Sequence, residues 1–307
     1  MISNHQFLGR EIEAEVGKML KQLAEKVDEL PMFGSRIIEW DISQSKGGDH
    51  QLPAVLFLRN FLELIDSIAI LIRNSSIDPC KSLLRTSLET FFYLDYLLDD
   101  EQERRAMCFL VWNAHRNIKL YKKLDGESEL FKQLKSKYAK DKYLKNIDPF
   151  IYKEIVNPAL ENSESLLNLP SYQPINLEYL RTKNLRKNPN WYSLYDGPKD
   201  VEELATKSQF SILYEILYRS WSQAVHGTDI IQGKISKSNS GQGEILQIRF
   251  PAEAQSITQY CFNLSIPIFQ KFIEKRIPEK IDEFKKWYME IRKFTLALAD
   301  AKIFTIK

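Results

Sequence analysis

The chain contains only three cysteines in 307 residues, at Cys80, Cys108 and Cys261. None of them has a second cysteine or a histidine at the spacing of metal ligands. Each lies in an apolar stretch that predicts a helix. We therefore expect three small buried hydrophobic side chains in a reducing compartment.

Long hydrophobic runs are also missing. No run of about eighteen apolar residues occurs, and the first residues, MISNHQFLGREIEAEVG, have no apolar signal core and carry acidic residues early. These absences predict no secretory signal, no membrane span and no membrane partner. We expect a soluble, cytoplasmic protein.

Neither sign of charge dominates, with 43 lysines and arginines against 41 aspartates and glutamates and a formal net charge of +2. This balance argues against a protein that coats nucleic acid through bulk charge, although it is compatible with a local basic groove. The sequence also has no Gly-rich phosphate loop, no nucleophile elbow and no histidine–carboxylate pattern of a metal centre. We therefore expect no cofactor and no metal.

Helical periodicity is what the sequence does contain, and 44% of its residues are hydrophobic. Apolar residues recur every three or four positions from residue 6 to about 30, where Pro31 is expected to end a helix. Residues 41–52 have turn chemistry and predict a loop. The strongly apolar residues 53–74 predict a buried helix.

A second strongly apolar helix is predicted at 79–99, with Asp78 as its N-cap and Pro79 at its first position. Residues 164–198 contain four prolines and predict a long irregular segment. Residues 228–250 predict a β-hairpin or a mobile loop. Further helices are predicted at about 101–125, 147–163, 199–226 with a break near Ser208, 251–275 and 278–303.

These elements predict an all-α fold, a helical bundle in which residues 53–74, 79–99 and 210–226 pack against one another. We divide the chain into an N-terminal helix and loop (1–50), a helical core with a basic helical insertion (51–230), and a hairpin or loop followed by C-terminal helices (231–307).

Two segments share the pattern Arg-x-x-Leu-Glu, in which Arg and Glu are four residues apart and meet on one helix face. They are Arg59–Glu63 and Arg85–Glu89, and both lie in the most apolar predicted helices. A charge buried there must be paired. Each pair is therefore either an internal ion pair that fixes the bundle, or an arginine that faces a cleft and binds an anion while its glutamate orients it.

The segment YRSWSQAVHG places three polar side chains on one helical stripe: Arg219, Ser222 and His226. A permanent cation, a hydroxyl and an imidazole are the groups needed for metal-free cleavage of an RNA phosphodiester. Histidine moves protons near neutral pH, and arginine stabilises charge on the phosphate. The alternative is that His226, followed by Gly227, is a C-terminal helix cap.

Basic residues cluster in two stretches with aromatic residues between them, a combination that suits single-stranded RNA or, more commonly, a solvated helix face. The cluster comprises Arg116, Lys119, Lys122, Lys123, Lys132, Lys135, Lys137, Lys140, Lys142, Lys145 and residues 181–187, with Tyr121, Phe131, Tyr138, Tyr143, Tyr179 and Trp191 interleaved.

Three stretches together resemble a bacterial family of HEPN-like helical proteins: RTSLETFFYLDYL (85–97), NWYSLYDGPKDVEELA (190–205) and YEILYRSWSQAVHG (214–227). The resemblance covers roughly residues 50–230. It implies a HEPN-like bundle, usually dimeric. Many members of that superfamily are metal-independent ribonucleases of bacterial defence and toxin–antitoxin systems, with four to six residues between a signature Arg and His. Arg219 and His226 match this signature.

The resulting hypothesis is a metal-independent endoribonuclease that acts as an antiphage-defence or toxin effector. His226 would be the general acid/base, Arg219 the phosphate stabiliser and Ser222 an auxiliary hydrogen-bonding residue. The Arg85–Glu89 and Arg59–Glu63 pairs are the candidate substrate-binding residues. Expected partners are RNA, a second copy of the chain and an antitoxin or defence-system protein.

The alternative hypothesis is a non-catalytic HEPN-like module that binds a nucleotide, RNA or protein partner. Exposure separates the two hypotheses, because catalysis requires Arg219 and His226 to face solvent. A structural role would bury both residues against carboxylate or backbone partners.

Overall fold

The computed structural model describes residues 12–44, 47–143, 153–228, 231, 234–237, 241 and 243–300. Within these residues the fold is all-α apart from one short β-hairpin, which confirms the predicted class. Among the described residues, no helix is long and apolar enough to cross a membrane. The chain divides into two compact units, and the second, residues 101–200, is inserted into the first. The predicted domain division at residues 50 and 230 stays a prediction, and neither position is a boundary of these two units.

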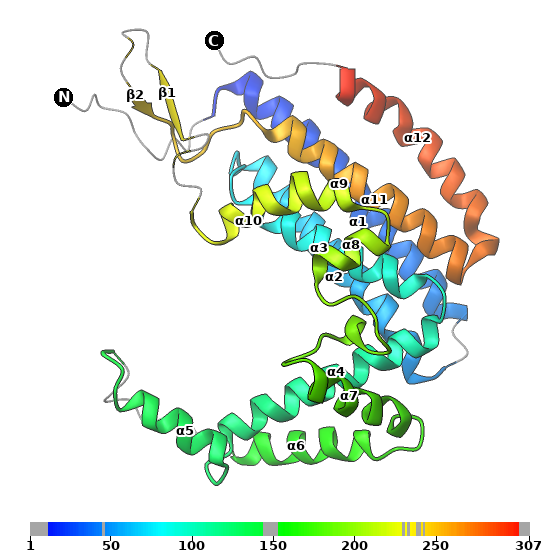
Figure 1. Cartoon of the computed structure of the whole chain (residues 1–307). Coiled ribbons are helices and arrows are strands. Elements are labelled where there is room, and N and C mark those ends of the chain that lie inside the picture. The colour runs from blue at the N-terminus through cyan, green and yellow to red at the C-terminus, as the bar shows by residue number, and fades with distance from the viewer. Residues whose placement is uncertain are drawn as a thin grey trace. The chain divides into compact units, whose positions relative to one another are not determined.

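The first unit is built from long helices that lie side by side (Figure 1). Its centre is apolar, and the thiols of Cys80 and Cys261 are completely buried within it. Burial raises the pKa of the Cys80 thiol to about 12. The long helices are α1 (Ala14–Gln44), α2 (Leu52–Arg73), α3 (Cys80–Leu98), α11 (Ala254–Arg276) and α12 (Ile281–Asp300).

The second unit is organised by α4 (Gln102–Leu124), which packs against α6 (Lys153–Leu167) and α7 (Gln173–Leu185). Val111 and Tyr172 are at the centre of a separate hydrophobic core. The lysine-rich stretch contains the short helix α5 (Glu129–Tyr138), which contacts α4. Lys145 lies outside the described residues.

The prediction that Pro31 ends the first helix is wrong, because α1 continues through it to Gln44. Proline removes one backbone donor, but the buried face of the helix continues past it to Ile37, which is completely buried. The prediction of a loop from residue 41 is wrong at its start for a related reason. Asp41 is helical and accepts hydrogen bonds of 2.8 and 2.7 Å from Arg276 of α11.

Two further local predictions are wrong. Pro79, not Asp78, is the N-cap of α3, and Asp78 instead forms ion pairs with Lys81 and Lys234. The segment 164–198 is not irregular throughout, because it contains α7 and a short 3-10 turn (Trp191–Ser193). Pro174 lies in the first turn of α7, where its missing N–H costs no helical hydrogen bond.

The predicted hairpin is present as β1 (Ile235–Lys237) and β2 (Gly243–Ile245), paired antiparallel with Ile235 opposite Ile245. The predicted break near Ser208 is also confirmed. It separates α8 (Val201–Lys207) from α9 (Ser211–Leu213), a turn of π-helix (Tyr214–Tyr218) and α10 (Arg219–Val225). Helix α3 packs against both α2 and α10, as predicted.

The crossing of α1 and α2 can be tested at a glycine. A Cβ added to Gly34 would overlap the δ carbons of the buried Leu62, whereas one added to Gly17 in the same helix would meet only one carbon, at 4.0 Å. We expect Gly34→Ala to destabilise the protein by about 1–3 kcal/mol, because it overpacks this contact. Gly17→Ala is the control, and it should stabilise by about 0.5–1 kcal/mol through helix propensity. Urea unfolding followed by circular dichroism measures both, and equal stabilisation would contradict the crossing.

Candidate active site

The segment from Tyr218, the N-cap of α10, to His226, its C-cap, has an aromatic buried face and an exposed face that carries the candidate catalytic residues. Tyr218 and Trp221 are 8% and 7% exposed, and Trp221 packs edge-on against Tyr260 of α11 with ring centroids 5.1 Å apart. These two anchors turn Arg219 and His226 toward solvent.

The guanidinium of Arg219 is half exposed and lies between two carboxylates. Its Nε is 2.9 Å from Oε2 of Glu215, one turn earlier, and one terminal nitrogen is 3.2 Å from both carboxylate oxygens of Glu202 in α8. Glu215 could be expected from its spacing of four residues. Glu202 could not, because the α8–α9 break brings it close.

His226 occupies the C-cap position of α10, and its backbone N–H donates to the carbonyl of Ser222. Gly227 follows with a φ of +65°, the left-handed conformation typical of a helix end. The backbone of His226 therefore serves as a cap, as the alternative interpretation holds. Its ring is exposed, and no hydrogen bond or ion pair to that ring is found among the described residues.

Arg219 and His226 do not converge within one chain. Seven residues of α-helix separate their α carbons by about 10 Å along the axis. The Arg219 side chain points to the N-terminal end of the helix, where Glu215 binds it, and so away from His226.

Tyr218 connects α10 to the Arg85–Glu89 pair of α3. Arg85 donates a 2.6 Å hydrogen bond to the Tyr218 hydroxyl and one of 3.1 Å to Glu89. The hydroxyl donates in turn to Glu89 over 3.3 Å, and Tyr93 donates to the other carboxylate oxygen over 2.5 Å. The guanidinium carbon lies 4.3 Å from the centre of the Tyr218 ring. Burial, and then the charge of Glu89, raise the pKa of the Tyr218 hydroxyl.

This network uses both terminal nitrogens of the Arg85 guanidinium as hydrogen-bond donors. Its side chain is 18% exposed, and its buried Nε is the one guanidinium nitrogen for which no acceptor is found in the described part of the chain. Of the two alternatives, the internal ion pair is therefore the one present here. Sequence reasoning missed Tyr218 as the third member, since it is 133 residues away.

The second pair behaves differently. Arg59 and Glu63 form a 2.8 Å ion pair, but their side chains are 65% and 60% exposed. Of the two alternatives, the internal ion pair is wrong here, because this face of α2 points to solvent, and Leu56 on the same helix is also 51% exposed. Arg59 and Glu63 line a groove between α1 and α2, together with the acidic Asp28 and Asp66.

Two features of the site had no clear sequence signal. The π-helical turn Tyr214–Tyr218 immediately precedes Arg219, and such turns are frequent at functional sites. Large apolar side chains also lie exposed on the same segment: Ile212 at 73%, Ile216 at 61% and Val225 at 42%. In the part of the chain that the structure describes, no three His, Cys, Asp or Glu side chains gather as metal ligands.

Residues 51–242 match the family model described as "Family of unknown function (DUF5677)". The chain belongs to this family. All seven predicted site residues lie within the DUF5677 segment, whereas α1, α11 and α12 lie outside it. No curated protein and no solved structure matches the chain. The description of DUF5677 assigns no activity, and the HEPN-like relationship stays a prediction.

The two Arg-x-x-Leu-Glu pairs give a matched stability test. Glu89→Ala strands the Arg85 guanidinium and leaves two tyrosine hydroxyls without their acceptor. We expect a loss of about 2 kcal/mol in the free energy of unfolding, less than for a fully buried pair because both side chains keep some exposure.

Glu63→Ala is the control, because it breaks the same motif on an exposed face. Its effect should stay within about 0.5 kcal/mol. Urea unfolding at neutral pH measures both variants, and equal losses would refute the structural role assigned to Glu89.

Proposed function

We propose that this DUF5677 protein is a metal-independent endoribonuclease whose active site forms between two copies of α10. The observation that carries the proposal is the joint exposure of Arg219 and His226 on a helix whose other face is anchored by Tyr218 and Trp221. A structural pair would instead be buried.

The distance between the two residues supports the proposal of a dimer. A single phosphodiester cannot contact two groups whose α carbons lie about 10 Å apart on one helix and whose side chains point in different directions. Two antiparallel copies of α10 would bring Arg219 of one copy opposite His226 of the other. The exposed Ile212 and Ile216 supply an apolar surface for this association, as such patches do at protein interfaces.

In this mechanism His226 takes the proton from the RNA 2′-hydroxyl, and the 2′ oxygen attacks the neighbouring phosphorus. The bond to the 5′ oxygen breaks, and that oxygen receives a proton, leaving a 2′,3′-cyclic phosphate. Arg219 stabilises the charge on the phosphate, and Ser222 supplies an auxiliary hydrogen bond. Arg85 acts through Tyr218 as a positioning residue.

The phosphate must first displace Glu202 and Glu215 from Arg219. All three side chains are more than half exposed, so each ion pair contributes only about 0–1 kcal/mol. This small cost is compatible with phosphate binding. The resemblance to HEPN-like proteins extends the proposal to a defence or toxin effector controlled by a protein partner.

The same two carboxylates favour the alternative, a non-catalytic module. An arginine neutralised on both sides presents less positive charge to an anion. The segment 211–225 would then bind a protein partner through Ile212 of α9 and Ile216 of the π-helical turn. If the wild-type protein cleaves no RNA, the result favours this alternative over the nuclease.

Cleavage of a mixed RNA pool by the purified protein should persist in excess EDTA and should leave 2′,3′-cyclic phosphate ends. Arg219→Ala and His226→Ala should each reduce the rate by roughly 10²-fold or more, because each removes a charge or proton-transfer group. Ser222→Ala should cost less, about 1 kcal/mol of barrier. A need for a divalent metal, or activity without His226, would refute the mechanism.

Mixing the two inactive variants tests the composite site. A heterodimer of the Arg219→Ala and His226→Ala chains contains one site with both groups intact, so the mixture should recover about a quarter of the wild-type rate. Two copies of either variant alone should stay inactive. Failure of the mixture to recover activity, with exchange of subunits verified, would place both groups in one chain.

A further inference from the structure

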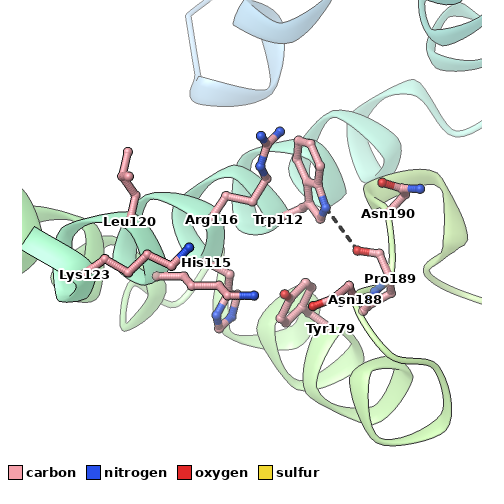
Figure 2. A pocket seen from close by; sticks show the side chains of 10 residues that line it. Trp112, His115, Arg116, Leu120, Lys123, Tyr179, Asn188, Pro189 and Asn190 are labelled. Carbon is pink, nitrogen blue, oxygen red and sulfur yellow. Dashed lines mark hydrogen bonds between the residues drawn. The ribbon is translucent and has the colours of Figure 1, made fainter. Parts of the chain in front are cut away.

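The second unit contains a cavity that the proposed nuclease site does not use. It has a volume of about 510 Å³ and lies between one face of α4 and residues 188–190 (Figure 2). A second cavity, of about 660 Å³, shares His115, Lys119, Tyr179 and Asn188 with it. Volumes of this size are typical of sites for small ligands.

Aromatic side chains form part of the wall of the first cavity, and contacts with neighbouring residues fix their orientation. The Trp112 indole donates a 3.1 Å hydrogen bond to the carbonyl of Pro189, the dashed line in Figure 2, and the Arg116 guanidinium lies 4.6 Å from the centre of the Trp112 ring. Beside them, the rings of His115 and Tyr179 are stacked, 4.0 Å apart and within 11° of parallel. These planes match the shape of an aromatic base.

The cations around the first cavity have no carboxylate partner among the residues that the structure describes. Arg116, Lys119 and Lys123 make no ion pair within the described residues, and the ten residues that line this cavity include no carboxylate. Arg104 and Arg181 of the same unit do form ion pairs, with Glu101 and Glu178. Three unpaired cations on successive turns of one helix face raise the local affinity for an anion.

The remaining polar groups of the wall are neutral. His115 Nε2 lies 2.7 Å from the Asn176 side-chain oxygen, so it is the protonated nitrogen and leaves Nδ1 as an acceptor. Burial lowers the pKa of His115 and raises that of Tyr179, so both side chains are uncharged at neutral pH. A neutral donor and acceptor suit the polar edge of a base.

We propose that this cavity binds a nucleotide unit, with the base against the Trp112 and His115–Tyr179 planes and the phosphate on Arg116, Lys119 and Lys123. The same chemistry is offered by a free nucleoside phosphate and by a nucleotide within single-stranded RNA. The proposal stands apart from the nuclease, because binding here requires no cleavage.

The test uses the full chain carrying His226→Ala, so that cleavage plays no part. One arm measures AMP binding by calorimetry, and the other measures fluorescence polarisation of a labelled, 2′-O-methylated single-stranded oligoribonucleotide. The cavity variant combines Arg116→Gln, Lys119→Gln and Lys123→Gln. The matched control combines Lys286→Gln, Arg292→Gln and Lys293→Gln, three exposed cations of α12 that line neither cavity and lie outside the basic stretches.

We expect the cavity variant to bind at least one of the two ligands about tenfold more weakly or worse, and the control to bind as the parent does. If the oligonucleotide is the ligand, the slope of log affinity against log salt should also fall by about 2 in the cavity variant. Binding of AMP identifies a free nucleotide as the source, and binding of the oligonucleotide alone identifies RNA.

Three results would overturn the proposal: no binding of either ligand, equal weakening by the control, or pyrophosphate competing as well as AMP. The last would show that the base contributes nothing. Melting followed by circular dichroism verifies that both triple variants are folded. If the wild-type protein cleaves no RNA but ligand binding at the cavity is observed, the proposed function is refuted and this inference is not.

Discussion

The hydrogen-bonded network of Arg85, Glu89 and Tyr218 is the constraint on which the presentation of α10 depends. It joins two helices that are more than a hundred residues apart in sequence, with a tyrosine hydroxyl that both accepts from the arginine and donates to the glutamate. Removing either charge would strand the other in a largely apolar setting. The network therefore fixes which face of α10 is turned inward.

That constraint determines the chemistry available at the surface. With Tyr218 and Trp221 turned inward, Arg219 and His226 are turned outward, and a lone chain cannot bring them together. The second unit offers a different set of groups. Its cavity is lined by cations of α4 that form no ion pair within the described residues, and by aromatic rings of α4 and α7. The first unit thus offers groups for proton transfer, and the second offers groups for binding.

Local patterns predicted much of this fold and less of its site. The helices at 53–74 and 79–99 were predictable from apolar density, and the Arg219–Glu215 pair from its spacing. The continuation of α1 through Pro31 was not predictable, because it depends on tertiary packing of the buried helix face on both sides of the proline. The difference in exposure between Arg85–Glu89 and Arg59–Glu63 could not be predicted either. Both pairs have the same sequence motif, and only tertiary packing buries the first.

Hydrogen–deuterium exchange gives the most direct measurement of whether the network holds α10. In Glu89→Ala, peptides covering residues 211–226 should exchange about tenfold or more faster than in the wild type, because local opening becomes easier by more than about 1 kcal/mol. Peptides of α12 should change little, and Glu63→Ala should leave both regions unchanged. Unchanged exchange in 211–226, or an equal increase in α12, would contradict the account.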